Sequence, residues 1–208
     1  LPPEVFDAIG PYVHACKMMG SMASQILGHT PKSLKVELAG GLADADPAPL
    51  LAAVLDGGLS YRRLGAFSAA NAESVASQHG ISVTTASVRD AGEYASSVRI
   101  VADEVEVAAT LFGTEHTPRI ISLMGYKIDI APATTSLVFE YVDAPGRIGV
   151  IGTILGDAAA NITTMQIGTK PEESCALVYM NVEGDVSEAV LDRLRGAIDL
   201  RNLWKITL

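Results

Sequence analysis

Polar side chains gather around one short turn in the second half of the chain. The stretch YVDAPGRIG runs from a strand-like segment through a Pro-Gly step into a helical pattern. Tyr141 and Asp143 share one face of an extended strand, so we expect both to point toward the helix start. A helix start offers free N–H groups and the positive end of a dipole, which suit a carboxylate.

The residue types at this turn are those that a free amino acid needs. The N–H groups from Gly146 to Ile148 can hold its carboxylate, and Asp143 can take its ammonium group. Asn161, which follows the helix, can both donate and accept a hydrogen bond. The candidate effector-binding residues are Tyr141, Asp143, Gly146, Arg147, Ile148 and Asn161. A purely structural alternative remains, in which Asp143 caps the helix and Asn161 ends it in a left-handed turn.

The helix that follows carries a stripe of glycines. Gly149, Gly152 and Gly156 recur at helical spacing, beside an isoleucine-rich face that should cover a sheet. Each glycine inside a helix costs roughly 1 kcal/mol relative to alanine, so the stripe predicts the close approach of a ligand or another backbone. The spacing is not that of a dinucleotide fingerprint and the sequence has no P-loop motif, which argues against nucleotide binding.

The bulk composition excludes several classes of function. The net charge of the 208 residues is −9, without a cluster of Lys and Arg, so we expect neither nucleic acid nor membrane as a partner. Apolar runs are too short for a transmembrane helix. Cys16 and Cys175 lack metal-ligand or redox spacing, and the 4 histidines have no recognisable catalytic partners. We therefore expect buried thiols in a reduced, cytoplasmic setting, with no catalytic residues and no metal site.

The first part of the chain predicts an α+β arrangement. A helical stripe from Tyr12 to Leu27 ends at Gly28. An alternating strand over 35–42 and two helices follow, and after them a run of strands predicts an antiparallel meander. The segments expected to form these later strands are ISVTTASV, SSVRIV, VEVAATLFG and RIISLMGYKIDI.

A linker is expected at 131–134, after which the pattern changes. The following segments predict strand, helix, strand, strand, helix and strand, at 135–143, 146–159, 162–168, 175–182, 186–197 and 203–208. Asp185 and Glu188 have the spacing of a capping box at the second helix. The order βαββαβ is the ferredoxin-like arrangement.

Three segments resemble parts of a known enzyme class. SLVFEYVDAPGRIGVIGTILGDAAANITTMQIG is similar to the ACT domain that ends one class of D-3-phosphoglycerate dehydrogenase. LFGTEHTPRIISLMGYKIDI resembles the close of the intervening, allosteric substrate-binding domain, and LPPEVFDAIGPYV resembles the end of the substrate-binding domain. The resemblance implies a helical remnant of that preceding domain at 1–28, an intervening α+β domain with antiparallel strands at 29–131, and a ferredoxin-like ACT domain at 135–208.

The resemblance also implies a function. Enzymes of this class perform the first committed oxidation toward L-serine with NAD, and serine feeds back on their ACT domains. The serine site lies where two ACT domains meet, so the implied partners are L-serine and a second copy of the chain. Tyr141, Asp143 and Asn161 match positions of that site, with the helix-start backbone alongside.

The resemblance places catalysis outside this chain. The nucleotide fingerprint and catalytic histidine of the family would precede Leu1, so we expect a piece of a longer protein that has no cofactor and no catalytic activity of its own. NAD is implied for the preceding part. The alternative is an assembly module whose ACT pocket no longer binds an amino acid.

A candidate anion site in the intervening domain departs from the family pattern. Some members bind an anion through basic residues near the last strands, and Arg119 stands at one such position with Lys127 nearby. Tyr126, Ala131 and Asn181 stand where arginines are expected. Because each charge-assisted hydrogen bond is worth roughly 1.5–3 kcal/mol, we favour a surface role for Arg119 over an anion site.

Overall fold

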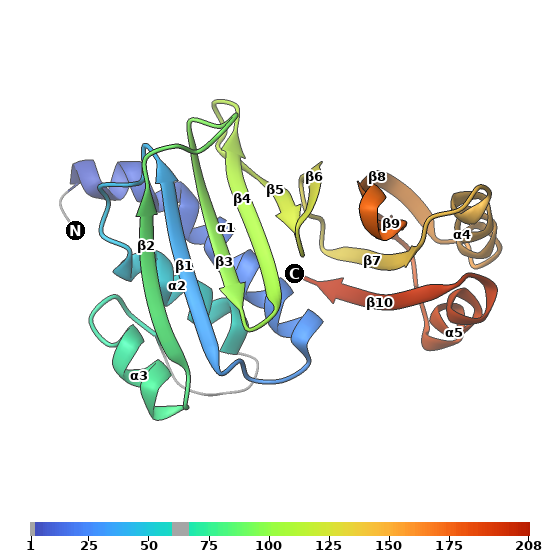
Figure 1. Ribbon diagram of the computed structural model, residues 1–208, viewed down its shortest axis with the longest axis horizontal. Coiled ribbons are helices and arrows are strands. Elements are labelled where there is room, and N and C mark those ends of the chain that lie inside the picture. The colour runs from blue at the N-terminus through green and yellow to red at the C-terminus, as the bar shows by residue number, and fades with distance from the viewer. Residues whose placement is uncertain (1–2, 60–66) are drawn as a thin grey trace. The chain divides into compact units, whose positions relative to one another are not determined.

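The computed structural model describes residues 3–59 and 67–208 and divides into two compact units, Leu1–Gly125 and Tyr126–Leu208 (Figure 1). Both units combine helices with sheets in which most neighbouring strands are antiparallel. The predicted α+β class is confirmed.

The first unit contains a mixed sheet with helices packed on it. Its elements are α1 (Pro3–Leu27), β1 (Ser33–Gly40), α2 (Ala48–Leu59), α3 (Ala72–Gln78), β2 (Ser82–Val88), β3 (Ser96–Ala102), β4 (Val105–Phe112) and β5 (Thr117–Leu123). The strand order within this unit is β2-β1-β3-β4-β5, and β6 (Tyr126–Ile130) begins the second unit. The helical stripe predicted for α1 is confirmed, because Tyr12, Cys16 and Met19 are buried in the core.

Two details of the predicted meander are wrong. The segment ISVTTASV forms β2, which pairs with β1 in parallel at the sheet edge. Because α2 and α3 lie between β1 and β2 in the chain, they provide the long crossover that a parallel pair requires. The segment RIISLMGYKIDI is two strands, β5 and β6, separated at Met124 and Gly125, both of which have positive φ.

Glycine sets the spacing between α1 and α2. A Cβ on Gly20 would overlap the carbonyl group of Val54, and a Cβ on Gly57 would overlap that of Lys17. The two helices therefore touch backbone to backbone, and a larger residue at either position would push them apart.

The second unit has the predicted order βαββαβ. Its elements after β6 are β7 (Thr135–Val142), α4 (Arg147–Asp157), β8 (Asn161–Lys170), a short 3-10 turn (Pro171–Glu173), β9 (Cys175–Glu183), α5 (Glu188–Ala197) and β10 (Leu200–Thr207). The strands form a four-stranded sheet in the order β10-β7-β9-β8. Figure 1 shows α4 and α5 together on one side of this sheet, and buried side chains of both helices belong to one core cluster with the sheet.

The opposite face of this sheet receives β6. A Cβ on Gly168 would lie 2.8 Å from the carbonyl oxygen of Lys127, so only a glycine leaves room for β6 at this point. The Tyr126 hydroxyl donates a hydrogen bond of 3.0 Å to Glu140, and the Lys170 ammonium lies 4.2 Å from the centroid of the Tyr126 ring. These contacts fasten β6 to β7 and β8.

The predicted linker is held by one buried amide. The Nδ2 group of Asn181 donates to the carbonyl oxygen of Ala131 at 2.8 Å, and Oδ1 accepts from the N–H of Ala133 at 3.2 Å. The hydroxyl of Ser136 also donates to Oδ1, at 2.9 Å. Asn181 is 4% exposed, so its polar atoms are satisfied within the protein.

The predicted capping box of α5 is wrong. The residue at the N-cap is Ser187, which makes no side-chain capping hydrogen bond, and the helix begins at Glu188. Glu188 instead accepts a hydrogen bond from Arg195 at 2.6 Å. The Glu188 carboxylate therefore pairs with another side chain of α5 and does not cap the backbone at the helix start.

We expect Gly57→Ala to lower the free energy of unfolding by at least about 2 kcal/mol, because its Cβ would overlap the Lys17 carbonyl. Gly196→Ala in α5 is the matched control, since an added Cβ there meets no atom within 4 Å. It should be neutral or stabilise the protein by up to roughly 1 kcal/mol through helix propensity. Urea denaturation of both variants measures the difference. Equal stabilities would contradict the backbone contact between α1 and α2.

Alkaline pH should destabilise the fold through buried tyrosines. Burial raises the pKa of Tyr12, Tyr126 and Tyr141, and raises the pKa of Tyr179 to about 12. Unfolded tyrosines ionise near pH 10, so above that pH the unfolded chain loses protons that the folded protein keeps. The contribution of these tyrosines to the free energy of unfolding should be constant up to about pH 9 and should then fall as pH rises above about 10.

The variant Tyr179→Phe isolates one of these tyrosines. The Tyr179 hydroxyl is buried and makes no hydrogen bond of good geometry within the described part of the chain, although the nearby Ser136 hydroxyl lowers its pKa, so its loss should leave stability at pH 7 nearly unchanged. It should also reduce the decline above pH 10 by up to about 1.4 kcal/mol per pH unit. Tyr126→Phe is the control, because it loses the bond to Glu140 and should be less stable already at pH 7. Denaturant titrations from pH 7 to 11 test this, and an unchanged alkaline slope in Tyr179→Phe would refute it.

Candidate functional site

The turn between β7 and α4 is shaped by a glycine. Gly146 is the N-cap of α4 and has φ 87° and ψ −14°, a left-handed conformation that other residues adopt only with strain. The N–H of Asp143, just after β7, donates to the carbonyl oxygen of Ser174 at 3.0 Å. The turn is therefore fixed on both sides.

Donors remain available at the start of α4. The N–H of Arg147 reaches the carbonyl oxygen of Ala144 at 3.5 Å, and that of Val150 reaches Gly146 at 3.1 Å. Among the described residues, no acceptor is found for the N–H groups of Ile148 and Gly149. A pair of free donors at the positive end of a helix is suited to an anion such as a carboxylate.

Asp143 does not cap this helix. The N-cap is Gly146, α4 has no side-chain capping hydrogen bond, and the Asp143 side chain is exposed. Asn161 does not end the helix either, because the left-handed residue after α4 is Ala159, with φ 55°, and Asn161 is the first residue of β8. The structural alternative for these two residues is wrong, and both side chains are available for other partners.

Tyr141 links the core to the turn. It is 1% exposed and packs in the cluster beneath α4 and α5. Burial is the main cause that raises the pKa of Tyr141, the nearby Asp143 carboxylate adds to the rise, and Arg147 opposes it. Tyr141, Asp143 and Arg147 therefore lie near one another where β7 leads into α4.

Arg147 contributes an atom that sequence reasoning did not single out. The Nε atom of its guanidinium group is buried and has no hydrogen-bond partner within the described part of the chain. The sequence predicts a role for Arg147 only through its backbone N–H group. Its half-buried side chain, beside a carboxylate and a phenol, can supply a further donor to an anionic group.

Asn161 lies at the other end of the sheet. Val142 pairs with Cys175, and Asn161 pairs with Glu183 at the far end of β9. The two partners are eight residue steps apart on β9, which at about 3.3 Å per step is roughly 26 Å. Within one chain, Asn161 and Asp143 therefore cannot contact the same small molecule.

The glycine stripe of α4 is open. A Cβ added at Gly149, Gly152 or Gly156 would meet no atom within 4 Å. Next to the stripe Val150 is 38% exposed, and on the edge strand β8 Ile167 is 43% exposed. Packing within the chain therefore does not explain why these helix positions are glycine.

The two residues of the candidate anion site belong to different units. Arg119 lies on β5 of the first unit, with its guanidinium carbon 5.5 Å from the ring centroid of Phe112. Lys127 is an exposed residue of β6 in the second unit. Tyr126 and Asn181, which stand where the family pattern has arginines, make internal hydrogen bonds instead.

The described residues offer few other reactive groups. No cluster of three or more His, Cys, Asp or Glu side chains in 3–59 and 67–208 is placed to hold a metal ion. Cys16 and Cys175 are free and buried, and burial raises the pKa of Cys16 to about 12, which keeps it a thiol. None of the described helices has the length and apolar character needed to cross a membrane.

Individual relatives resemble the chain over nearly its whole length. Proteins named D-3-phosphoglycerate dehydrogenase are 27% identical in Mycobacterium tuberculosis, 27% in Bacillus subtilis and 25% in Methanocaldococcus jannaschii. The matches cover 98%, 99% and 100% of this chain and 40% of each relative. The chain thus spans about two-fifths of the length of these proteins.

A solved structure of the quorum-quenching acylase GqqA matches 38% of this chain and 33% of its own, with 22% identity and a TM-score of 0.30. A likeness this low supports no conclusion about fold or function.

The family comparison is decisive for the first unit. A model described as the D-3-phosphoglycerate dehydrogenase intervening domain matches residues 8–124. This range is more than half of the chain and runs from within α1 to just past the end of β5. The chain belongs to the D-3-phosphoglycerate dehydrogenase intervening domain family.

Proposed function

We propose that this chain is the regulatory part of a D-3-phosphoglycerate dehydrogenase and that its second unit is an ACT domain that binds L-serine between two copies. The observation that carries the proposal is the separation of Asp143 from Asn161 along the sheet. A site that uses both residues needs Asp143 from one copy and Asn161 from another.

A two-fold axis beside α4 supplies that arrangement. In a symmetric pair the same face of each copy meets its counterpart, so the start of one α4 lies near the end of the other. The start of α4 carries Asp143 and Gly146, and Asn161 follows its end. Two such sites form, related by the axis.

The open glycine stripe supports this pairing. Gly149, Gly152 and Gly156 allow another backbone to approach α4 closely, and the exposed Val150 and Ile167 beside them supply apolar area. The strand β8 is an edge of its sheet and can continue it in a partner copy.

The chemistry at the turn favours an amino acid with a small polar side chain. Its carboxylate accepts from the N–H groups of Ile148 and Gly149, and its ammonium pairs with Asp143. Asn161 of the second copy, which can donate and accept, completes the set and suits the hydroxyl of serine.

The whole protein, on this proposal, oxidises 3-phosphoglycerate with NAD in serine biosynthesis, and serine inhibits it by feedback. The names of the relatives support that activity, and the part of each relative that this chain does not cover would hold the catalytic residues and the NAD site.

A second candidate is an assembly module without a ligand. The open glycine face and the exposed edge strand favour it, because neither needs an amino acid in order to mediate association. The two candidates differ in whether L-serine binds.

Calorimetric titration with L-serine tests the main proposal, with D-serine and glycine as comparators. Saturable binding of L-serine should be lost in Asp143→Ala, which removes the ammonium partner, and in Asn161→Ala. Both side chains are exposed, so the variants should keep the wild-type melting temperature. Absence of heat from a folded, associated wild type would leave the assembly module as the function.

Mixing the two inactive variants tests whether the site is shared. If copies exchange at random, half of the pairs combine Asp143→Ala with Asn161→Ala, and each such pair contains one intact site and one doubly mutated site. About a quarter of the wild-type serine sites should return. No recovery after verified exchange would show that the two residues do not act in one shared site.

Self-association should depend on the glycine stripe. We expect Gly152→Leu to weaken association by roughly tenfold or more, because overpacking of a close contact costs about 1–3 kcal/mol. Gly196→Leu is the matched control, since it adds the same side chain to α5 in equally open space. Sedimentation equilibrium measures both. A monomeric wild type at tens of micromolar, or equal effects of the two variants, would refute this interface.

A further inference from the structure

The strand β2 forms an open edge of the sheet in the first unit (Figure 1). It pairs with β1 along its whole length, from Ser82 to Val88, and no described residue pairs with its other side. Such an edge presents a row of backbone N–H and C=O groups, which can pair with a strand of another chain.

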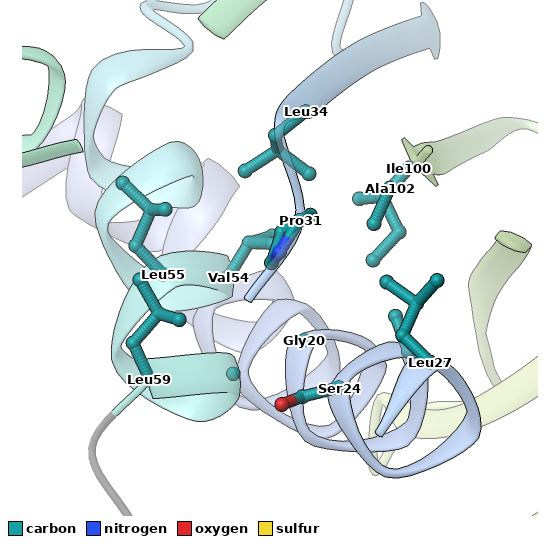
Figure 2. Close-up of a pocket in the computed structure, with 12 residues that line it drawn as sticks. Gly20, Ser24, Leu27, Pro31, Leu34, Val54, Leu55, Leu59, Ile100 and Ala102 are labelled. Atoms are coloured by element: carbon teal, nitrogen blue, oxygen red, sulfur yellow. The ribbon is translucent and has the colours of Figure 1, made fainter. Parts of the chain in front are cut away.

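The helices that cover the sheet leave β2 accessible. Figure 2 shows Leu34 of β1 and Ile100 of β3 among side chains of α1 and α2. On β2, by contrast, five of the seven side chains are exposed, those of Ser82, Thr84, Thr85, Ser87 and Val88. A second strand can therefore add to this edge without displacing a described side chain.

The sequence of β2 lacks the features that usually protect an exposed edge. Edge strands commonly carry lysine, proline or a bulge, which prevent pairing with another chain. β2 reads SVTTASV, with no charged residue, no proline and no register shift against β1. Each of the other described strands has at least one charged residue, and the edge strands β8 and β10 carry Lys170, Arg201 and Lys205.

This sequence favours pairing with an identical strand. A two-fold axis through Thr85 sets Val83 of one copy opposite Ser87 of the other, in an antiparallel pair. The two Thr85 residues then face each other, and a cross-strand pair of threonines is favourable. The chain has a net charge of −9, so a second copy is best accepted along a strand that adds no charge repulsion.

The residues that flank β2 favour the antiparallel orientation. Arg89 and Asp90 follow the strand, and His79 and Gly80 precede it. Antiparallel pairing places the residues after one strand beside those before the other, whereas parallel pairing would set like charges side by side. We propose that β2 pairs antiparallel with β2 of a second copy and joins the two first-unit sheets into one. This interface lies in the first unit and does not depend on the proposed serine site.

A charge at Thr85 tests the proposal in a chain that also carries Gly152→Leu, which weakens the other proposed interface. In this background the protein should still sediment as a dimer at tens of micromolar. Thr85→Lys places two lysines opposite each other and should weaken the dimer by about fivefold or more, and Thr85→Glu should do the same. An equimolar mixture should recover association, because lysine then faces glutamate.

Thr117→Lys is the matched control, because it makes the same change at an exposed position of β5 in the same sheet. It should leave the dimer unchanged. A monomer in the Gly152→Leu background, equal effects of the two lysine variants, or no recovery in the mixture would overturn the proposal.

Amide hydrogen exchange of the wild type gives a second measurement that needs no variant. The N–H groups of β2 that point away from β1 should exchange slowly at tens of micromolar and faster on dilution, because pairing protects them. Fast exchange of these amides at every concentration would overturn the proposal, even if the chain associates through another surface.

Discussion

The direction of α4 along the four-stranded sheet is the constraint on which the proposed site depends. Both β7 and β8 pair antiparallel with β9, so they run parallel to each other and α4 must carry the chain back from one end of the sheet to the other. Residues before and after α4 are therefore far apart, however close they are in the sequence. A ligand that contacts Asp143 and Asn161 together implies a second copy of the chain.

Glycine has two distinct roles in this chain. At Gly20, Gly57 and Gly168 an added Cβ would come too close to backbone of the same unit, so the fold itself accounts for the residue. Along α4 an added Cβ would be free of contacts, yet each glycine lowers helix stability relative to alanine. A destabilising residue without an internal reason points to an external one, such as a partner or a ligand.

Periodicity predicted the elements well because most of them bury one face. The stripe on α1 and the order βαββαβ follow directly from apolar spacing. Strand pairing was harder, because local pattern does not reveal that β2 pairs in parallel with β1. The capping box failed because the spacing of Asp185 and Glu188 does not fix where α5 begins. At the site, the chemistry inferred from residue types stays a prediction, and the distance from Asp143 to Asn161 could be found only from the strand topology.

Strand β7 takes part both in the proposed site and in the contact with β6, the first strand of the second unit. Glu140 and Tyr141 are neighbours on β7 and point to opposite faces, as alternation requires. Tyr141 faces α4 and the turn, whereas Glu140 accepts hydrogen bonds from Tyr126 of β6 and from Asn202. The two side chains of β7 thus contribute to opposite faces of the sheet, one to the core beneath α4 and the other to the contact with β6.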